Sequence, residues 1–102
     1  MRIKELRVEI VVPVSDLSKF ETEVQKVFKG WVIHPKEKIC EGLWEQWIEL
    51  SPRCCVVLQI IQESSNFICT VRGFTKKAER KVMRLIAHFR QWVVKEQICF
   101  LS

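Results

Sequence analysis

Cysteine, histidine and acidic residues are the side chains of this sequence that most often hold metals or attack substrates. None of the five cysteines forms a C-x-x-C pair, and His34 and His88 do not have the spacing of zinc ligands. Asp16, the sole aspartate, is better explained by a helix start. The three glycines form no phosphate-binding loop or dinucleotide fingerprint. We therefore predict no enzyme activity, no catalytic residues, no metal site and no cofactor.

The cysteines themselves allow two interpretations. Free cysteine is among the most buried residue types, which favours reduced thiols in the core. The alternative is one intracellular disulfide, as hyperthermophiles form. Cys40, Cys69 and Cys99 all fall in predicted strands, so two of them meeting across a sheet would satisfy it. We favour the first interpretation, and the sequence does not say which two cysteines would pair in the second.

Positive charge is concentrated in the last third of the chain. The formal net charge is +5, yet residues 1–71 hold nine Lys and Arg against ten acids, whereas residues 72–102 hold eight against two. Steps of three and four residues along one predicted helix face connect Lys77, Lys81, Arg84 and His88, and Arg80 flanks them. Such a stripe suits phosphates or an acidic protein, the alternative being a solvated face partly neutralised by glutamates.

Two tryptophans indicate a different contact surface. If residues 43–50 form a strand, Trp44 and Trp47 point to opposite sides, one into the core and one outward or into a groove. Exposed tryptophan is a common hot-spot residue in protein recognition. The same run also has a helical apolar face, but Gly42 is a poor helix entrance and we favour a hairpin with a turn at 41–42. That hairpin would place Lys38 opposite Glu45.

Hydrophobic periodicity predicts the elements that must position these residues. Apolar residues recur at three and four over 16–29 and 76–94, which predicts two amphipathic helices with Ser15 and Thr75 as N-caps. Gly30 fits the end of the first helix, where φ is usually positive. Alternation or apolar runs predict strands, bounded by proline, glycine and serine turns, at 3–14, 31–34, 36–40, 43–50, 53–62 and 67–72, with a short last strand at 97–101.

An internal echo links the two helices. At an offset of 61 residues, Phe28 matches Phe89, Trp31 matches Trp92 and Val32 matches Val93. Two related α/β motifs, 1–50 and 51–102, packed with pseudo-two-fold symmetry would leave a groove between them. The alternative is that any two amphipathic helices share such spacing.

Composition bounds the class of protein. The 102 residues are 48% hydrophobic and 28% charged, the fractions of an ordinary globular chain, and suffice for a single domain, 1–102. The longest apolar run is far short of a membrane span of about 18 residues, and the first residues show no secretory signal. We therefore expect a cytoplasmic protein with no membrane partner.

The runs ICEGLWEQW at 39–47 and PRCCVV at 52–57 give the chain a recognisable appearance. It resembles 102-residue orphan proteins from filamentous viruses of the Acidianus filamentous virus type, which infect hyperthermophilic archaea. The resemblance covers the full length and rests on overall appearance. It implies a small α/β protein in the cytoplasm of a hot, acid-loving host, without enzyme activity.

We thus predict an α+β fold with a mixed or mainly antiparallel sheet of five to six strands and two amphipathic helices. The alternative is a ferredoxin-like β-α-β-β-α-β unit with an extra hairpin. The predicted function is a protein-protein interaction module that binds a peptide or partner segment through Trp44 and Trp47, in the groove between the halves or at a sheet edge. The alternative function is nucleic-acid binding by the basic helix. The sequence does not determine the oligomeric state.

Overall fold

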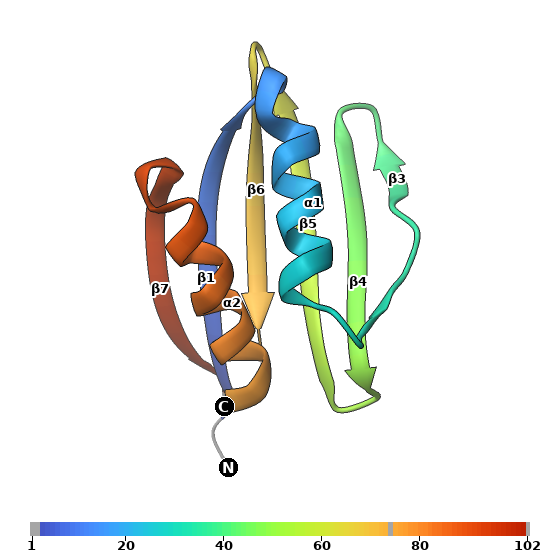
Figure 1. Cartoon of the computed structure of the whole chain (residues 1–102), viewed down its shortest axis with the longest axis vertical. Coiled ribbons are helices and arrows are strands. Elements are labelled where there is room, and N and C mark those ends of the chain that lie inside the picture. Colours follow the sequence, from blue (N-terminus) through green and yellow to red (C-terminus); the bar gives the residue numbers. More distant parts are fainter. Residues whose placement is uncertain (1–2, 74, 102) are drawn as a thin grey trace.

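The computed structural model describes residues 3–73 and 75–101. It contains two α-helices, α1 (Leu17–Val27) and α2 (Lys76–His88), each joined to a 3-10 turn, η1 (Val14–Asp16) and η2 (Arg90–Trp92). The strands are β1 (Ile3–Pro13), β2 (Val32–Ile33), β3 (Glu37–Cys40), β4 (Leu43–Ser51), β5 (Cys54–Glu63), β6 (Asn66–Gly73) and β7 (Val93–Leu101) (Figure 1). The predicted α+β class and both helices are confirmed.

All of these strands join one antiparallel sheet in the order β2-β4-β5-β6-β1-β7, with β3 also paired to β4. The sheet has seven strands, so the prediction of five to six was too low. The segment beside β4 is split into two short strands around Pro35, which cannot donate to a ladder. The chain order and the pairing β7-β1-β6-β5 are those of the β-α-β-β-α-β alternative, with an extra hairpin of β2 and β3 with β4 inserted between α1 and β5.

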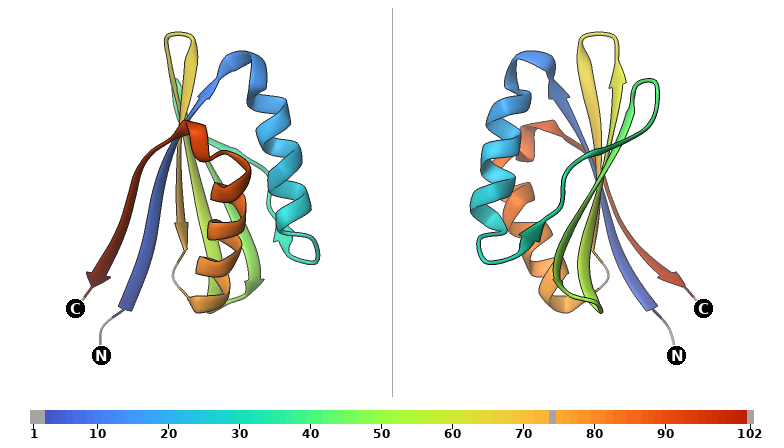
Figure 2. Two further views of the ribbon diagram at one scale, coloured as in Figure 1. Left: turned by 60° about the vertical axis from the view of Figure 1, so that its left-hand side comes forward. Right: turned by 90° about the vertical axis from the view of Figure 1, so that its right-hand side faces the viewer.

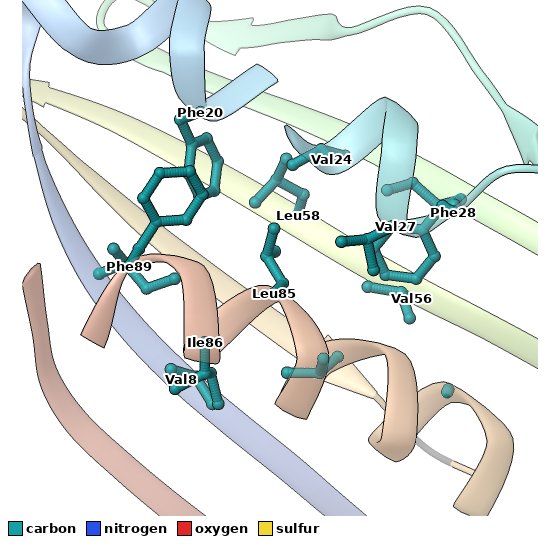
Figure 3. Close-up of a cluster of buried hydrophobic side chains, with 14 of the residues drawn as sticks. Val8, Phe20, Val24, Val27, Phe28, Val56, Leu58, Leu85, Ile86 and Phe89 are labelled. Carbon is teal, nitrogen blue, oxygen red and sulfur yellow. The ribbon is translucent and has the colours of Figure 1, made fainter. Parts of the chain in front are cut away.

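Both helices cover the same face of the sheet, and the other face carries no described helix (Figure 2). Alternate residues of β1 point toward the helices and are buried, namely Leu6, Val8, Ile10 and Val12. Figure 3 shows the core between the layers, where Phe20 of α1 meets Phe89 with ring centroids 5.3 Å apart. The helix side of the sheet therefore holds the main core, and the opposite side is left as an open face.

The first helix begins at Leu17, one residue later than predicted. Ser15 lies in η1, and the N-cap of α1 is Asp16, which makes no side-chain capping hydrogen bond. The 3-10 turn replaces the cap because β1 runs directly into it through Pro13. The helix ends at Val27, two residues earlier than predicted, with Phe28 rather than Lys29 as the C-cap. Gly30 nevertheless has the expected positive φ, +89°, in the turn that follows.

The second helix is shorter than predicted. Its N-cap is Thr75, as expected, and the Thr75 hydroxyl accepts a hydrogen bond of 3.1 Å from the Ala78 amide. However, α2 ends at His88, and β7 begins at Val93, so the predictions of a helix to 94 and a last strand from 97 were wrong. The chain turns because Phe89 leaves helical geometry at φ −128° and Trp92 stacks on its ring, with centroids 5.2 Å apart and planes at 7°.

The β3–β4 hairpin is confirmed, but its register differs from the prediction by one residue. Glu37, rather than Lys38, lies opposite Glu45, and Lys38 lies opposite Trp44. An irregularity between Lys38 and Cys40 shifts the pairing. Lys38 instead binds Glu41 in the turn, with 2.8 Å between Nζ and Oε2.

Candidate functional site

The open face of the sheet is ordered in rows, because directly paired residues of antiparallel strands share a face. One row is apolar and crosses four strands at Leu43, Ile61, Ile68 and Val11. The next row is polar, at Glu45, Gln59, Thr70, Glu9 and Lys95. The third row joins Trp47 and Val57 to Arg72, Arg7 and Gln97. This face therefore offers apolar, hydrogen-bonding and charged groups side by side.

Trp47 contributes an exposed aromatic ring to this face. It is 46% exposed, and Val57, directly opposite on β5, is buried although no described helix covers this side. The indole Nε1 donates to Glu45 at 3.0 Å, and Gln59 donates to the other oxygen of the same carboxylate at 3.1 Å. These hydrogen bonds, from Gln59 first and then Trp47, lower the pKa of Glu45. The ionised carboxylate in turn fixes the orientation of the indole.

Trp44 lies on the helix side of the same strand. It packs against the core, with its ring centroid 6.4 Å from that of Phe67. It also lines a hollow of about 350 Å³ near the start of α1. The structure thus confirms that residues 43–50 form a strand and that the two tryptophans point to opposite sides. It does not bring Trp44 and Trp47 together.

A notch lies beside Trp47 at the edge of the open face. It has a volume of about 370 Å³ and is lined by His34, Pro35, Glu37, Trp47 and Glu49, and we call it the acidic notch. The His34 imidazole Nε2 lies 3.6 Å from Oε1 of Glu49. The strand break between β2 and β3 brings His34 and Pro35 next to β4, where the His34 amide donates to the Trp47 carbonyl at 2.9 Å.

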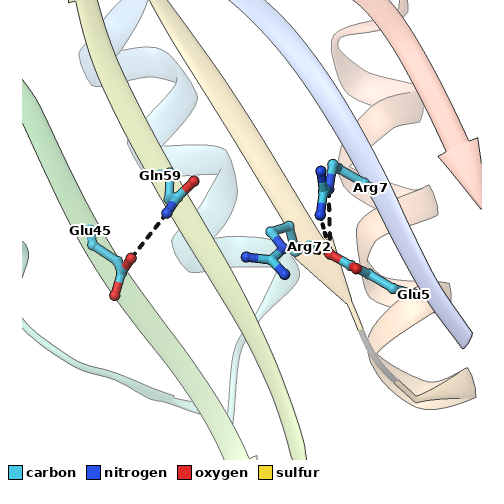
Figure 4. A network of polar contacts seen from close by, with 5 residues as sticks. All are labelled: Glu5, Arg7, Glu45, Gln59 and Arg72. Atoms are coloured by element: carbon cyan, nitrogen blue, oxygen red, sulfur yellow. Dashed lines mark hydrogen bonds and ion pairs between the residues drawn. The ribbon is translucent and has the colours of Figure 1, made fainter. Parts of the chain in front are cut away.

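A second, polar hollow of about 230 Å³ lies across β5, β6, β1 and β7. It is lined by Arg7, Glu9, Gln59, Thr70, Arg72, Lys95 and Gln97. Beside it, the side chain of Glu5 has no exposed surface and binds Arg72 and Arg7 through Oε1 (Figure 4). Burial raises the pKa of Glu5, but the hydrogen bonds and charges of Arg72, then Arg7, outweigh burial and lower it. Glu5 is therefore a charged carboxylate that holds two arginines in the sheet.

The predicted basic stripe lies on α2, on the other side of the molecule. Lys77, Arg80 and Arg84 are exposed, and Lys81 is half-buried. Within the part of the chain that the structure describes, none of these four forms an ion pair within 4 Å. His88 is exposed and lies 3.7 Å from Glu23 of α1. The stripe thus remains a largely uncompensated positive surface.

The space between the two helices is filled by core side chains. Phe20 and Phe89 meet there, and Val24 and Leu85 are buried in the same cluster (Figure 3). A peptide could not enter between the helices without displacing these residues. The open face and the acidic notch are the more accessible surfaces of the fold.

Sequence reasoning missed Glu5, Arg7 and Arg72 as a cluster. Alternation along β1 indicates that Glu5 and Arg7 share a face, but Arg72 is 67 residues from Glu5 and joins them only through the pairing of β1 with β6. His34 was considered only as a possible zinc ligand, and Pro35 only as a break. The chain signal that existed was the run of glutamates near Trp47, which the notch uses at Glu37 and Glu49.

The cysteines are only partly described. Cys40, Cys54 and Cys55 are free thiols, and the side chains of Cys69 and Cys99 lie outside the described residues. Cys54 is buried as expected, whereas Cys40 is exposed, so the prediction of a buried thiol was wrong there. Burial, followed by the charge of Glu49 and the neighbouring Cys54, raises the pKa of the Cys55 thiol, which keeps it protonated at neutral pH.

Among residues 3–73 and 75–101, no three His, Cys, Asp or Glu side chains gather in a way that would hold a metal ion. Neither of the described helices is long and apolar enough to span a bilayer.

The sequence matches no protein-family model and no curated protein.

Proposed function

We propose that the chain is a non-enzymatic protein-interaction module that binds an extended segment of a partner on the open face of the sheet, around Trp47. The observation that carries this proposal is the indole itself, which is exposed yet held in one orientation by Glu45. An anchor ordered before binding loses little rotamer entropy when the partner arrives. Tryptophan residues of this kind dominate the energetics of many interfaces.

The surroundings of Trp47 suit a short extended segment. Leu43 lies four residues along β4, about 13 Å away at the usual strand rise, and begins the apolar row of the open face. Four extended residues of a partner span the same distance. Such a segment would contact the indole at one end and the apolar row at the other, crossing the polar row at Glu45 and Gln59.

Panning a displayed peptide library against the immobilised protein tests this proposal. We expect enriched peptides whose affinity falls at least about tenfold with Trp47→Ala, the size of a hot-spot contact. Arg84→Glu, on the helix side of the molecule, is the matched control and should leave the affinity unchanged. Peptides that bind the Trp47→Ala variant as tightly as the wild type, with its fold verified by circular dichroism, would contradict the proposal.

Nucleic-acid binding by α2 is the second candidate. It is supported by the exposed cations Lys77, Arg80 and Arg84, which have no counter-ion among the described residues. Four phosphate contacts would make affinity fall about a hundredfold between 50 and 200 mM salt. Fluorescence anisotropy with labelled single- and double-stranded DNA and RNA measures this affinity and its dependence on salt. The double variant Lys81→Glu/Arg84→Glu should abolish such binding and spare a peptide on the open face, and no anisotropy change at 50 mM salt would exclude this candidate.

We also propose that residues 1–50 and 51–102 are two related motifs with pseudo-two-fold symmetry, and that the chain is a viral protein of the host cytoplasm. One observation supports a pseudo-two-fold origin of the fold. Phe28 and Phe89 are the C-cap residues of α1 and α2, and each ring packs on the tryptophan three residues later, at 5.3 and 5.2 Å. The ring geometries differ, edge-on for Phe28 and Trp31 but stacked for Phe89 and Trp92.

A further inference from the structure

The acidic notch combines an aromatic face with carboxylates. Trp47 and Pro35 supply apolar surface, and Glu37 and Glu49 supply negative charge, around about 370 Å³ of space. Among the described residues that line the notch there is no lysine or arginine. A cation with an apolar stem matches this lining, because a ring face attracts a cation and the stem packs on apolar surface.

The nearby lysines are engaged elsewhere. Lys36 binds Glu21 of α1, with 2.6 Å between Nζ and Oε1, and Lys38 binds Glu41. Glu37 consequently has no ion pair among the described residues, and Glu49 has only the His34 imidazole at 3.6 Å. The carboxylates of the notch are therefore available to an external cation.

The sheet register adds an independent reason for a cation at this place. Glu37 lies directly opposite Glu45 across the β3–β4 pair. Like charges in that position are unfavourable. Glu45 stays ionised because Gln59 and Trp47 donate to it. A positive group beside Glu37 would offset this repulsion, so the unbound notch is less favourable than the same notch with a cation.

We propose that the acidic notch binds the side chain of a lysine or arginine from the partner segment, with its cation between the Trp47 indole and the carboxylates of Glu37 and Glu49. This inference rests on the proposed function and names the chemistry of the partner. The indole faces a cation in a fixed orientation because Glu45 holds its N–H. The protein's overall charge of +5 opposes the approach of a basic partner, so recognition depends on these short-range contacts.

The test follows the indole N–H resonance of Trp47, assigned by its loss in Trp47→Phe, in two-dimensional NMR. The probes are the methylamides of Nα-acetyl-lysine and Nα-acetyl-norleucine. They have the same aliphatic side chain, but only the lysine probe carries an ammonium group at its end. We expect the lysine probe to shift this resonance saturably. The norleucine probe should bind at least about fivefold more weakly, a difference within the range of cation–π and exposed ion-pair contacts. Equal responses to the two probes would overturn the proposal.

Variants separate the notch from its surroundings. Glu37→Gln/Glu49→Gln should weaken binding of the lysine probe at least about fivefold, whereas Glu63→Gln, an exposed glutamate at the end of β5 and outside the notch, should not. Unchanged affinity in the double variant would contradict the proposal. So would a dimer of the protein alone, seen by sedimentation and lost in the double variant, because it would assign the notch to a second copy. If panned peptides lacked Lys and Arg but depended on Trp47, the proposed function would stand and this inference would fail.

Discussion

Replacing Phe89 with alanine is expected to lower the free energy of unfolding by about 3–5 kcal/mol, a large part of the roughly 5–15 kcal/mol of a domain this size. The Phe89 ring is 2% exposed and contacts Phe20 on one side and Trp92 on the other, at 5.3 and 5.2 Å. Its loss opens a cavity where α1, α2 and the start of β7 meet. Urea unfolding followed by circular dichroism measures the change.

Met83→Ala is the matched control for Phe89→Ala. Met83 lies on the same helix but is 40% exposed, so its truncation should cost less than about 1 kcal/mol. Similar losses for the two variants would contradict the assignment of Phe89 to the junction of the helices. An unchanged dependence of the free energy on urea concentration would show that the folded state, rather than the unfolded ensemble, was altered.

Replacing Arg72 with methionine is expected to lower the free energy of unfolding by about 2–4 kcal/mol at pH 7. The Glu5 carboxylate, which is buried from solvent, would lose its main ion-pair partner. Arg7→Met is the matched control. The Arg7 side chain is 44% exposed, and its Nη2 lies 3.4 Å from Oε1 of Glu5, a longer contact than that of Arg72. We therefore expect a loss of about 1 kcal/mol or less. Equal losses in the two variants would show that Arg72 is not the main counter-ion of Glu5.

The effect of Arg72→Met should shrink in acid. The fold lowers the pKa of Glu5 below its ordinary value of 4.5, so the carboxylate contributes stability above that pH. This contribution disappears as the pH falls through the lowered pKa, where Glu5 is neutral in both proteins. Urea unfolding of wild type and variant at pH 7, 5 and 3 should therefore give a difference that narrows toward pH 3. A constant difference would mean that Arg72 acts through contacts other than the Glu5 charge.

Much of the local structure could be predicted from the sequence. The spacing of Phe20, Val24 and Val27 predicted the buried face of α1, and Thr75 was recognised as a cap. These features depend on neighbours within about one helical turn, where periodicity and capping preferences act. The division of Trp44 and Trp47 between the two faces followed in the same way from strand alternation.

Features that depend on distant partners could not be predicted. The end of α2 carries no glycine or proline, and Phe89, Trp92 and Val93 continue the helical spacing although tertiary stacking ends the helix at His88. The same holds for Glu5, an acidic residue on an alternating strand that is expected to be exposed until its pairing with β6 is known. The notch depends on the break at Pro35 and on a one-residue shift at Lys38, both of which arise from pairing with β4.

The position of β1 in the sheet has a consequence for the order of folding. Among the described strands, β1 pairs only with β6 and β7, and its pair Ile3 and Leu101 lies 98 residues apart in the sequence. During synthesis β1 leaves the ribosome before the other described strands, so its backbone hydrogen-bonding groups stay unpaired until the later strands follow. Such long-range pairing slows folding to the millisecond-to-second range. β1 therefore has no strand partner until β6 has been made, and its second edge stays unpaired until β7 follows.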